Sequence, residues 1–306
     1  MDIDLQILDD LSSICGIDAI LCNEPMSSHT TFEIGGPADF FVEPSTEDEI
    51  KELINYCINT NKKYRILGLG SDLLISDNGL RGIVIHLGNR FSNIEIDRCS
   101  CTLTAQAGAS NEKVSDAACA AGLSGYEFAS GIPGSIGGAA IMNAGAYDGE
   151  LKDVAVYVRC IDEKGQFAIV KNKLADWSYR HSMMSDKGYV ILNVTLSLTP
   201  DEPALIRERI DELTAKRESK QPLDMPSAGS TFKRPKGYFA GPLIQEAGMQ
   251  GAKVGGAQVS EKHAGFVVNA GGASSSDVWG LIKKVQDEVQ KKSGVKLEPE
   301  VRFWED

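Results

Sequence analysis

The sequence lacks several features that mark other classes of protein. It has no apolar run of about 20 residues, the length that crosses a membrane, so we expect no membrane partner. It has no surplus of basic residues, since 31 Lys and Arg stand against 43 Asp and Glu and give a formal net charge of −12. Because nucleic-acid binding needs clustered cations for phosphate contacts, that class is excluded. A small acidic ligand needs only a few local cations and stays compatible with this composition.

Metal-binding patterns are also missing. The four histidines are scattered without ligand spacing, so we expect no structural metal. Cys57 and Cys119 fall on apolar helix faces, and Cys99 and Cys101 alternate along an expected strand. This placement favours core thiols in a reducing compartment. The start, residues 1–5, is acidic where a signal peptide is basic, so we expect a cytoplasmic protein.

The hydrophobic pattern predicts a mixed fold of normal globular composition. The 306 residues are 42% hydrophobic and 24% charged, which suits two or three domains. Strands and helices mix without a regular βαβ rhythm, so the predicted fold class is α+β. The predicted helices cover 46–60, 111–121, a charged stretch after 200–203, and 277–292. The predicted strands cover 64–67, 81–87, 101–107, 154–161, 166–171 and 189–198.

Local signals sharpen some of these boundaries. Thr46 and Glu49 form a predicted capping box, and Gly122 and Gly294 are predicted to end the second and last helices. The stretch 217–226 is predicted to be a linker into a last domain. On the charged helix before it, one face is predicted to carry the apolar residues Leu205, Ile206, Ile210 and Leu213.

Two glycine-rich stretches suggest a nucleotide site. Gly68–Leu74 follows a strand, but it lacks the third glycine of a G-x-G-x-x-G fingerprint and no long helix follows, so it is a weak Rossmann signal. Its backbone N–H groups and the Ser71 hydroxyl could face a pyrophosphate, or it could be an ordinary turn between strands. We call Gly131–Tyr147 the glycine segment. Its density of glycine predicts close approach of the backbone to a flat cofactor, the alternative being tight packing of a helix on a sheet.

Other candidates are single polar residues. Ser230 lies between Gly229 and Thr231 in a stretch without periodicity, Ser227–Lys233, which we call the serine segment. Its hydroxyl can give or take a proton, although a surface turn is the ordinary interpretation. Glu300 follows a proline in an apolar ending, where partial burial would raise its pKa and suit proton transfer; a surface glutamate in a last strand is the alternative.

Three cations complete the set of candidates. Arg180 stands among polar neighbours after Trp177, and alone it would be taken for a surface arginine. Arg217 and Lys220 could clamp a diphosphate, or they could be the solvated end of a charged helix, which the residues by themselves favour.

Seven stretches in order resemble the UDP-N-acetylenolpyruvoylglucosamine reductases, the MurB family, over essentially the whole chain. The resemblance is to the shorter, type II branch, which has no inserted tyrosine loop. Single matches are weak, but seven in the same order are specific. The matching stretches are 30–39, 68–74, 131–147, 179–182, 227–233, 255–266 and 297–302.

The resemblance implies an FAD-dependent oxidoreductase, a UDP-N-acetylmuramate dehydrogenase of peptidoglycan synthesis. NADPH would give a hydride through non-covalent FAD to C3 of UDP-N-acetylglucosamine enolpyruvate, forming UDP-N-acetylmuramate. The implied fold is a vanillyl-alcohol-oxidase-like (PCMH-type) pair of FAD-binding subdomains with a C-terminal α+β substrate domain. The implied domains are 1–90, joined by the tail 297–306, then 91–200, and the substrate domain 201–296. We expect a monomer.

The same resemblance assigns roles to residues. Ser230 is the implied general acid toward C2, and Arg180 and Glu300 are the implied stabilisers of the developing enolate. The implied substrate-binding residues are Arg217, Lys220, Arg234, Gln258, Ser260 and His263. The implied cofactor-binding residues are Gly68, Gly70, Ser71, Asp72, Leu73, Gly131, Pro133, Gly134, Ser135, Gly137, Gly138, Asn143, Gly145, Ala146 and Tyr147.

This chain departs from the family pattern at three positions. Asp72 stands where asparagine is usual, Asp148 stands where glycine is commoner, and Arg234 stands where the longer branch has an asparagine that touches substrate. Two other classes stay open from the residues. One is an FAD-dependent oxidase or dehydrogenase of the same fold that acts on a sugar or alcohol. The other is a nucleotide-binding regulator without activity, against which Arg180, Ser230 and Glu300 together argue.

Overall fold

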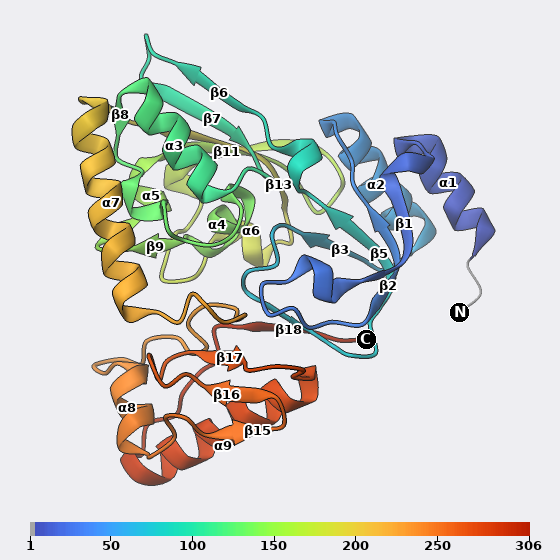
Figure 1. The fold of residues 1–306 in the computed structure, drawn as a ribbon. Coiled ribbons are helices and arrows are strands. Elements are labelled where there is room, and N and C mark those ends of the chain that lie inside the picture. The colour runs from blue at the N-terminus through green and yellow to red at the C-terminus, as the bar shows by residue number, and fades with distance from the viewer. Residues whose placement is uncertain (1–3) are drawn as a thin grey trace. The chain divides into compact units, whose positions relative to one another are not determined.

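The structure is a computed structural model that describes residues 4–306, so the first three residues of the acidic start lie outside the described residues. The chain forms two compact units, each described here by itself (Figure 1). Unit 1 contains residues 4–22, 40–69 and 82–217, and unit 2 contains residues 23–39, 70–81 and 218–306. The division into three domains stays a prediction.

A five-stranded antiparallel sheet is the frame of unit 1. Its strand order is β12-β11-β13-β7-β6. A second sheet has the order β1-β2-β5-β3, in which β3 and β5 run parallel. The strands of the two sheets are β1 (Ile20–Pro25), β2 (Pro37–Val42), β3 (Tyr64–Leu67), β5 (Leu80–His86), β6 (Ile94–Asp97), β7 (Thr102–Gln106), β11 (Ala155–Ile161), β12 (Phe167–Lys171) and β13 (Val190–Ser197). The six predicted strands are confirmed to within a residue or so.

Helices and short strands complete unit 1. Figure 1 shows α3 and α4 beside the five-stranded sheet, with α7 running along the edge of the unit. The helices are α1 (Leu5–Cys15), α2 (Glu47–Thr60), α3 (Asn111–Ala121), α4 (Ile136–Met142), α5 (Leu151–Val154), α6 (Met183–Asp186) and α7 (Pro203–Lys220). The short elements are β8 (Leu123–Ser124), the 3-10 turn η4 (Glu127–Ala129), β9 (Gly145–Ala146), β10 (Gly149–Glu150) and β14 (Thr199–Pro200).

The ends of the helices agree with the predictions in part. The Thr46 hydroxyl accepts the Glu49 N–H at 3.2 Å, as a capping residue should. The Glu49 carboxylate, however, accepts the backbone N–H of Ser45 at 2.6 Å, so the predicted reciprocal bond to Thr46 is wrong. Gly122 ends α3 in the left-handed conformation, at φ 71°, as predicted.

The charged helix is longer than predicted. It continues to Lys220, so the linker predicted over 217–226 begins only at Gln221. Ile206 and Ile210 are buried with Cys119, whereas Leu205 is 45% exposed. Leu205 was expected on the buried face, but it lies one position off the 206–210 spacing, about 100° around the helix.

Cys99 and Cys101 lie in a turn and not in a strand. The Asp97 carboxylate accepts the backbone N–H of Cys99 at 2.8 Å and caps the turn, which ends with Cys101 at φ 54°. Cys99 is exposed, so the expectation of a core thiol is wrong there. Cys57 and Cys119 are buried, as predicted.

Unit 2 is a small α+β structure with its own core. The antiparallel sheet β15-β16-β17 packs against α9 (Figure 1), and β4 and β18 form a parallel pair. One face of α9 is fully buried, and Gly294 ends the helix as predicted. The elements are β4 (Leu73–Ile75), α8 (Ala240–Glu246), β15 (Lys253–Val254), β16 (Ala257–Val259), β17 (Val267–Asn269), α9 (Ser275–Ser293) and β18 (Arg302–Trp304).

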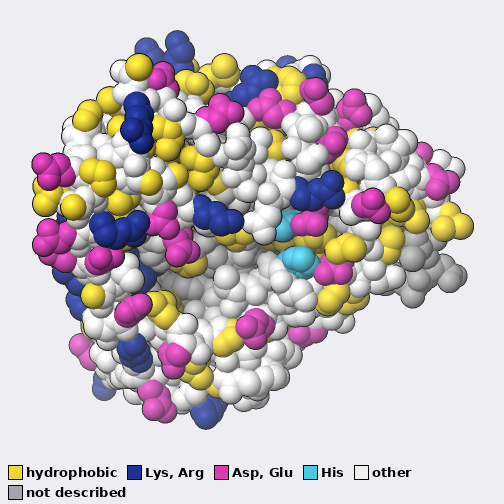
Figure 2. Space-filling view, turned by 45° about the horizontal axis from the view of Figure 1, so that its top comes forward, with side chains coloured by type: hydrophobic (Ala, Val, Ile, Leu, Met, Phe, Trp, Pro, Cys, Tyr) yellow, Lys and Arg dark blue, Asp and Glu magenta, His cyan; other side chains and the backbone are white. Residues whose placement is uncertain are grey.

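The surface is charged and mixed. Figure 2 shows acidic and basic side chains interspersed over one face, in keeping with an acidic but otherwise ordinary composition. Within residues 4–306, no helix is long and apolar enough to cross a membrane.

Candidate functional site

The glycine segment packs against the large sheet of unit 1 with no room for a side chain at Gly137. A Cβ at that position would lie 2.7 Å from the Ala107 Cβ and 2.9 Å from the Ala107 carbonyl oxygen. Backbone bonds fix this approach, because Gly137 N–H donates to Ala107 O at 3.0 Å and Ile136 N–H donates to Ala109 O at 2.8 Å. Ser135 caps α4 by accepting the Gly138 N–H at 3.3 Å. Tight packing of a helix on a sheet therefore explains Gly137.

Gly138 has no such explanation. It is exposed, and a Cβ there would meet only the Ser135 hydroxyl, at 3.6 Å. Glycine inside a helix costs roughly 1 kcal/mol relative to alanine, so the fold alone would favour alanine. Gly68 also lies close to this point, since a Cβ there would come within 2.5 Å of the Ser135 hydroxyl oxygen. An exposed helix glycine beside a second glycine loop fits a flat ligand, such as a flavin, that approaches the backbone closely.

From Gly70 onward, the Gly68–Leu74 loop belongs to unit 2. Gly70 adopts φ 61°, and Leu73 is buried at the start of β4. The Asp72 backbone carbonyl accepts the Arg302 N–H at 2.9 Å, and the two side chains form an ion pair at 3.7 Å. Asp72, where asparagine is usual in the family, thus has a partner of opposite charge in the C-terminal strand. Ser71 is half-buried beside it.

Arg180 lies in a tight turn of unit 1, Ser178–His181, which we call the Arg180 turn. Ser178 and His181 exchange two backbone hydrogen bonds, at 3.1 and 3.2 Å. The Arg180 guanidinium carbon lies 4.8 Å from the centre of the Tyr179 ring. The pKa of Glu150 is lowered, first by its hydrogen bond with Lys152 and also by the positive charge of Arg180. Arg180 therefore lies close enough to Glu150, three residues after the glycine segment, for its charge to lower the pKa of that carboxyl.

Arg217 contacts the glycine segment at both ends. Its guanidinium donates to the carbonyl of Gly131, and a Cβ at Gly131 would lie 3.0 Å from the Arg217 Cδ. Burial lowers the pKa of Arg217, while its hydrogen bond with Tyr147 opposes this shift. The Tyr147 hydroxyl also donates to Leu213 O at 3.3 Å. Arg217 is thus more than a solvated helix end, whereas Lys220, three residues later, is exposed.

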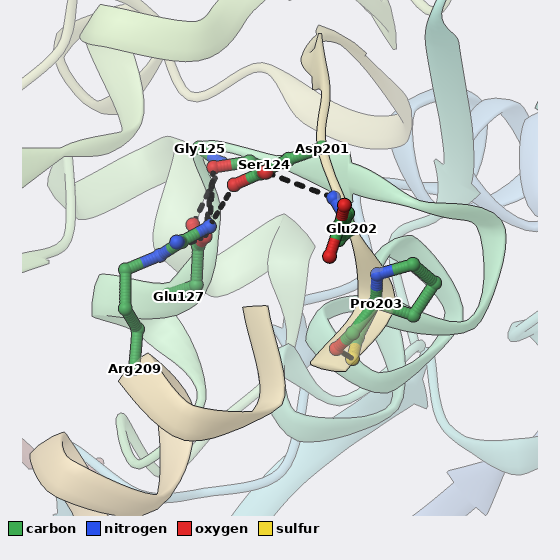
Figure 3. A network of polar contacts seen from close by, with 8 residues as sticks. Ser124, Gly125, Glu127, Asp201, Glu202, Pro203 and Arg209 are labelled. Carbon is green, nitrogen blue, oxygen red and sulfur yellow. Dashed lines mark hydrogen bonds and ion pairs between the residues drawn. The ribbon is translucent and has the colours of Figure 1, made fainter. Parts of the chain in front are cut away.

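An ionic network fixes the start of α7 to the turn that precedes the glycine segment (Figure 3). Arg209 donates to the Glu127 carboxylate at 2.9 Å and to the Asp201 carboxylate at 2.6 Å. Glu127 also accepts the Ser124 hydroxyl at 2.8 Å and the Gly125 N–H at 2.6 Å. Burial would raise the pKa of Glu127, but these hydrogen bonds outweigh it and the pKa is lowered. These contacts therefore favour the ionised carboxylate of Glu127, the first residue of η4.

Ser230 and Glu300 lie on two neighbouring stretches of unit 2. The serine segment runs antiparallel to the C-terminal tail, because Phe232 pairs with Pro299. Glu300 N–H donates to Thr231 O at 2.8 Å, which places Glu300 directly beside the residue after Ser230. Thr231 is buried and its hydroxyl accepts the Val267 N–H at 2.8 Å, so the segment is anchored there while Ser230 is exposed. Glu300 is half-buried, which agrees with the first of the two interpretations of this residue and not with a fully exposed surface glutamate.

The other predicted substrate residues lie in unit 2 with partners of their own. The Gln258 amide donates to Gly251 O at 3.5 Å and to the Glu261 carboxylate at 3.2 Å. The Ser260 hydroxyl accepts the N–H of His263 at 3.2 Å, and burial lowers the pKa of His263. The Arg234 guanidinium lies 4.0 Å from the centre of the Phe239 ring. Their direct contact with substrate stays a prediction.

Sequence reasoning missed two groups of residues around the site. Glu127 and Arg209 were not predicted, because an ion pair between residues 82 positions apart leaves no local pattern in the sequence. Ser182 was missed although it ends the matched stretch 179–182, because a serine close to an arginine in sequence is ordinary on a surface. Its burial is visible only in the structure.

The glycine segment, the Gly68 loop and the sheet behind them define the FAD-binding class of protein. Residues 38–171 match the family model of the FAD binding domain, and residues 221–304 match the C-terminal domain of UDP-N-acetylenolpyruvoylglucosamine reductase. The solved structure of an alkyldihydroxyacetonephosphate synthase shares the fold at a TM-score of 0.50, 15% identity and coverage of 64% of this chain and 40% of that one. The predicted α+β fold with a vanillyl-alcohol-oxidase-like (PCMH-type) FAD-binding part is thereby confirmed.

Similar proteins narrow the FAD-binding class to one family. The chain is 50% identical to the UDP-N-acetylenolpyruvoylglucosamine reductase of Agathobacter rectalis, with 93% of each chain covered. It is 44% identical to that of Caldanaerobacter subterraneus subsp. tengcongensis, with 97% of each covered. The crystal structure of the Thermus caldophilus enzyme matches at a TM-score of 0.80 and 33% identity, covering 94% of this chain and 98% of that one. The chain belongs to the UDP-N-acetylenolpyruvoylglucosamine reductase family, and it is a flavin-dependent oxidoreductase.

Proposed function

We propose that this chain reduces UDP-N-acetylglucosamine enolpyruvate to UDP-N-acetylmuramate with NADPH, as a cytoplasmic monomer in peptidoglycan synthesis. The substrate class comes from the names of relatives 44–50% identical over nearly the whole chain. The observation that carries the proposal is the pairing of the serine segment with the tail, which brings Ser230 and Glu300 onto adjacent stretches. Bound FAD would supply two-electron hydride transfer to C3 of the enolpyruvyl group.

The residues of the chain would handle charge and the proton. Addition of hydride at C3 leaves an electron pair at C2, delocalised into the neighbouring carboxylate. The Ser230 hydroxyl donates its proton to C2 as general acid and regains one from solvent, which completes the reduction of the double bond. The Arg180 guanidinium stabilises the developing negative charge. Glu300 can assist only in its protonated form, because an ionised carboxylate has no hydrogen to donate.

Other residues would bind the nucleotide and the flavin. Arg217 and Lys220 are proposed to contact the diphosphate, where cations on one helix face suit a doubly charged group. Arg234, Gln258, Ser260 and His263 are proposed to line the rest of the substrate site. Gly68, Gly138 and their neighbours are proposed to hold the flavin without a covalent bond, since Gly68–Leu74 and the glycine segment contain no His or Cys.

An anaerobic absorbance titration tests the proposal. NADPH should bleach the flavin absorbance, and the enolpyruvyl nucleotide should restore it. The product should be heavier than the enolpyruvyl nucleotide by two hydrogen atoms. Acid precipitation should release all the flavin into the supernatant. Bleaching by a sugar or alcohol in place of NADPH, with no recovery on addition of the nucleotide, would favour an oxidase or dehydrogenase of the same fold instead.

A further inference from the structure

The Arg180 turn holds its central residue in a costly backbone conformation. Arg180 has φ 57°, in the left-handed region that disfavours residues with a Cβ. A turn with positive φ at this position normally takes glycine or asparagine. Such a conformation persists only where the surrounding structure fixes it, and strained residues of this kind gather at functional sites.

Two buried polar side chains tie this turn to the glycine segment. Asn143 is 0% exposed, and its amide donates to Ser178 O at 3.1 Å and to the Glu150 carboxylate at 3.1 Å. Its amide oxygen accepts the Lys152 N–H at 3.0 Å. Both amide hydrogens are therefore used inside the protein, which leaves neither for the flavin that the family resemblance assigns to Asn143.

The second tie lies on the other side of Arg180. Ser182 is also 0% exposed, and its hydroxyl donates to Ile141 O at 2.9 Å. The two bonds involve Ser178, two residues before Arg180, and Ser182, two residues after it. Their other ends are Asn143, which caps the C-terminus of α4, and Ile141 in the last turn of that helix, so the chain around Arg180 is held at two points against one element.

We propose that Asn143 and Ser182 are positioning residues that fix the guanidinium of Arg180 relative to the glycine segment. The inference rests on the proposed role of Arg180 in stabilising the enolate. A charge that stabilises a transition state must be held in place before the reaction, because the free energy needed to reorient it during the reaction would offset the stabilisation that it provides. A displacement of about 1 Å can slow a reaction by roughly 100-fold.

A double-mutant cycle on the nucleotide half-reaction tests this. Flavin absorbance is followed after mixing NADPH-bleached enzyme with saturating enolpyruvyl nucleotide, for wild type, S182A, R180A and the double variant. We expect S182A to slow the reaction about 10- to 100-fold in the wild-type background, and by less than about twofold in the R180A background. S115A is the matched control, because Ser115 is a buried serine of unit 1 whose hydroxyl has no hydrogen-bond partner among the described residues. Its rate should match wild type.

The second variant is N143G, since glycine keeps the left-handed backbone of Asn143 at φ 43° while removing the amide. N143G should slow the nucleotide half-reaction in the wild-type background but have little effect on its rate in the R180A background. The N143G protein should still retain its flavin. An equal slowing by S182A in both backgrounds, or none in wild type, would overturn the positioning role. An R180A enzyme that reacts at the wild-type rate would overturn the role of Arg180 itself, and the positioning proposal with it.

Discussion

The glycine segment of unit 1 and the serine segment of unit 2 use glycine for different physical reasons. In the first, Gly137 is required by packing, because a Cβ there would collide with Ala107. In the second, a Cβ at Gly229 would have no atom within 4 Å, so packing does not require glycine there. Glycine is favoured because the backbone has a φ of 72°, in the left-handed region. The first is a dense surface suited to holding a rigid cofactor. The second is an anchored but open turn that leaves Ser230 exposed for chemistry.

The largest expected effect separates two neighbouring glycines in α4. Gly137→Ala should lower the free energy of unfolding by about 1–3 kcal/mol, the usual cost of overpacking. Gly138→Ala should leave the flavin-free protein as stable as wild type or more stable, because its Cβ would meet only the Ser135 hydroxyl, at 3.6 Å. It should still weaken flavin binding, because the added methyl group would lie on the face that is proposed to meet the flavin. Urea unfolding with and without FAD, together with a flavin titration, checks both. Unchanged flavin affinity in Gly138→Ala would remove the argument that this face meets the flavin.

The ionic network of Glu127, Arg209 and Asp201 should give the next largest effect. At pH 7, Glu127→Gln should cost about 1–2 kcal/mol, because it weakens hydrogen bonds to a charged group. The folded pKa of Glu127 lies below its ordinary value of 4.5, so its contribution is present above that pH and is lost as pH falls through the folded pKa. The stability gap between variant and wild type should therefore narrow below about pH 4.5.

Asp116→Asn is the matched control for that experiment. Asp116 pairs with Arg207 of the same helix as Arg209, but both side chains are about half exposed, so the pair should contribute little at any pH. Urea unfolding between pH 3 and pH 7 measures both variants. A gap for Glu127→Gln that stays constant over this range would contradict the role of the ionised carboxylate.

Lys220→Ala should raise the KM for the enolpyruvyl nucleotide about tenfold with little change in kcat. This is the signature of lost uniform binding, and one charge-assisted hydrogen bond accounts for about that factor. Lys216→Ala is the control, since Lys216 lies one turn earlier and pairs with Glu212 at 3.7 Å. Steady-state kinetics on purified enzyme distinguish them. A fall in kcat at constant KM would place Lys220 elsewhere in the cycle.

The smallest effect concerns Gly229. Gly229→Ala should cost about 1 kcal/mol, because the alanine meets no neighbour but must adopt a left-handed backbone. Gly229→Asn should cost less, since asparagine tolerates that region. Urea unfolding of the two variants measures the difference. If Asn and Ala are equally costly and both exceed the cost of Gly137→Ala, the contrast between the two segments fails.

The sequence predicted what depends on local pattern. The apolar strand patterns located the two neighbouring strands of 154–161 and 166–171, and a terminal glycine located the end of α3. It failed where a distant group decides the outcome. The Glu49 carboxylate accepts the N–H of Ser45 and not that of Thr46, and the Asp97 carboxylate accepts the N–H of Cys99 and stabilises a turn there in place of the predicted strand. Similarly, no local pattern shows that Gly137 meets Ala107, thirty residues away.

For the site, the sequence supplied residues and the structure supplied their surroundings. Ser230, Arg180 and Glu300 were candidates from the residues themselves, and the resemblance assigned their roles, which stay predictions. The structure adds that Asn143 and Ser182 are buried against the Arg180 turn. It also shows Arg217 bonded to Gly131. These contacts join residues that are distant or unremarkable in sequence, so only the folded chain reveals them.

The central claim is that the serine segment supplies a proton and the glycine segment holds the flavin. Rapid-mixing absorbance of Ser230→Ala tests it most directly, by measuring each half-reaction separately. Bleaching by NADPH should proceed at close to the wild-type rate, whereas recovery with the enolpyruvyl nucleotide should slow by roughly 10²- to 10⁴-fold, the usual contribution of a positioned acid. Ser230→Cys should regain part of the loss, because a thiol can still donate a proton. Equal slowing of both half-reactions would contradict the account, since it would mean that Ser230 shapes the site without acting as the acid.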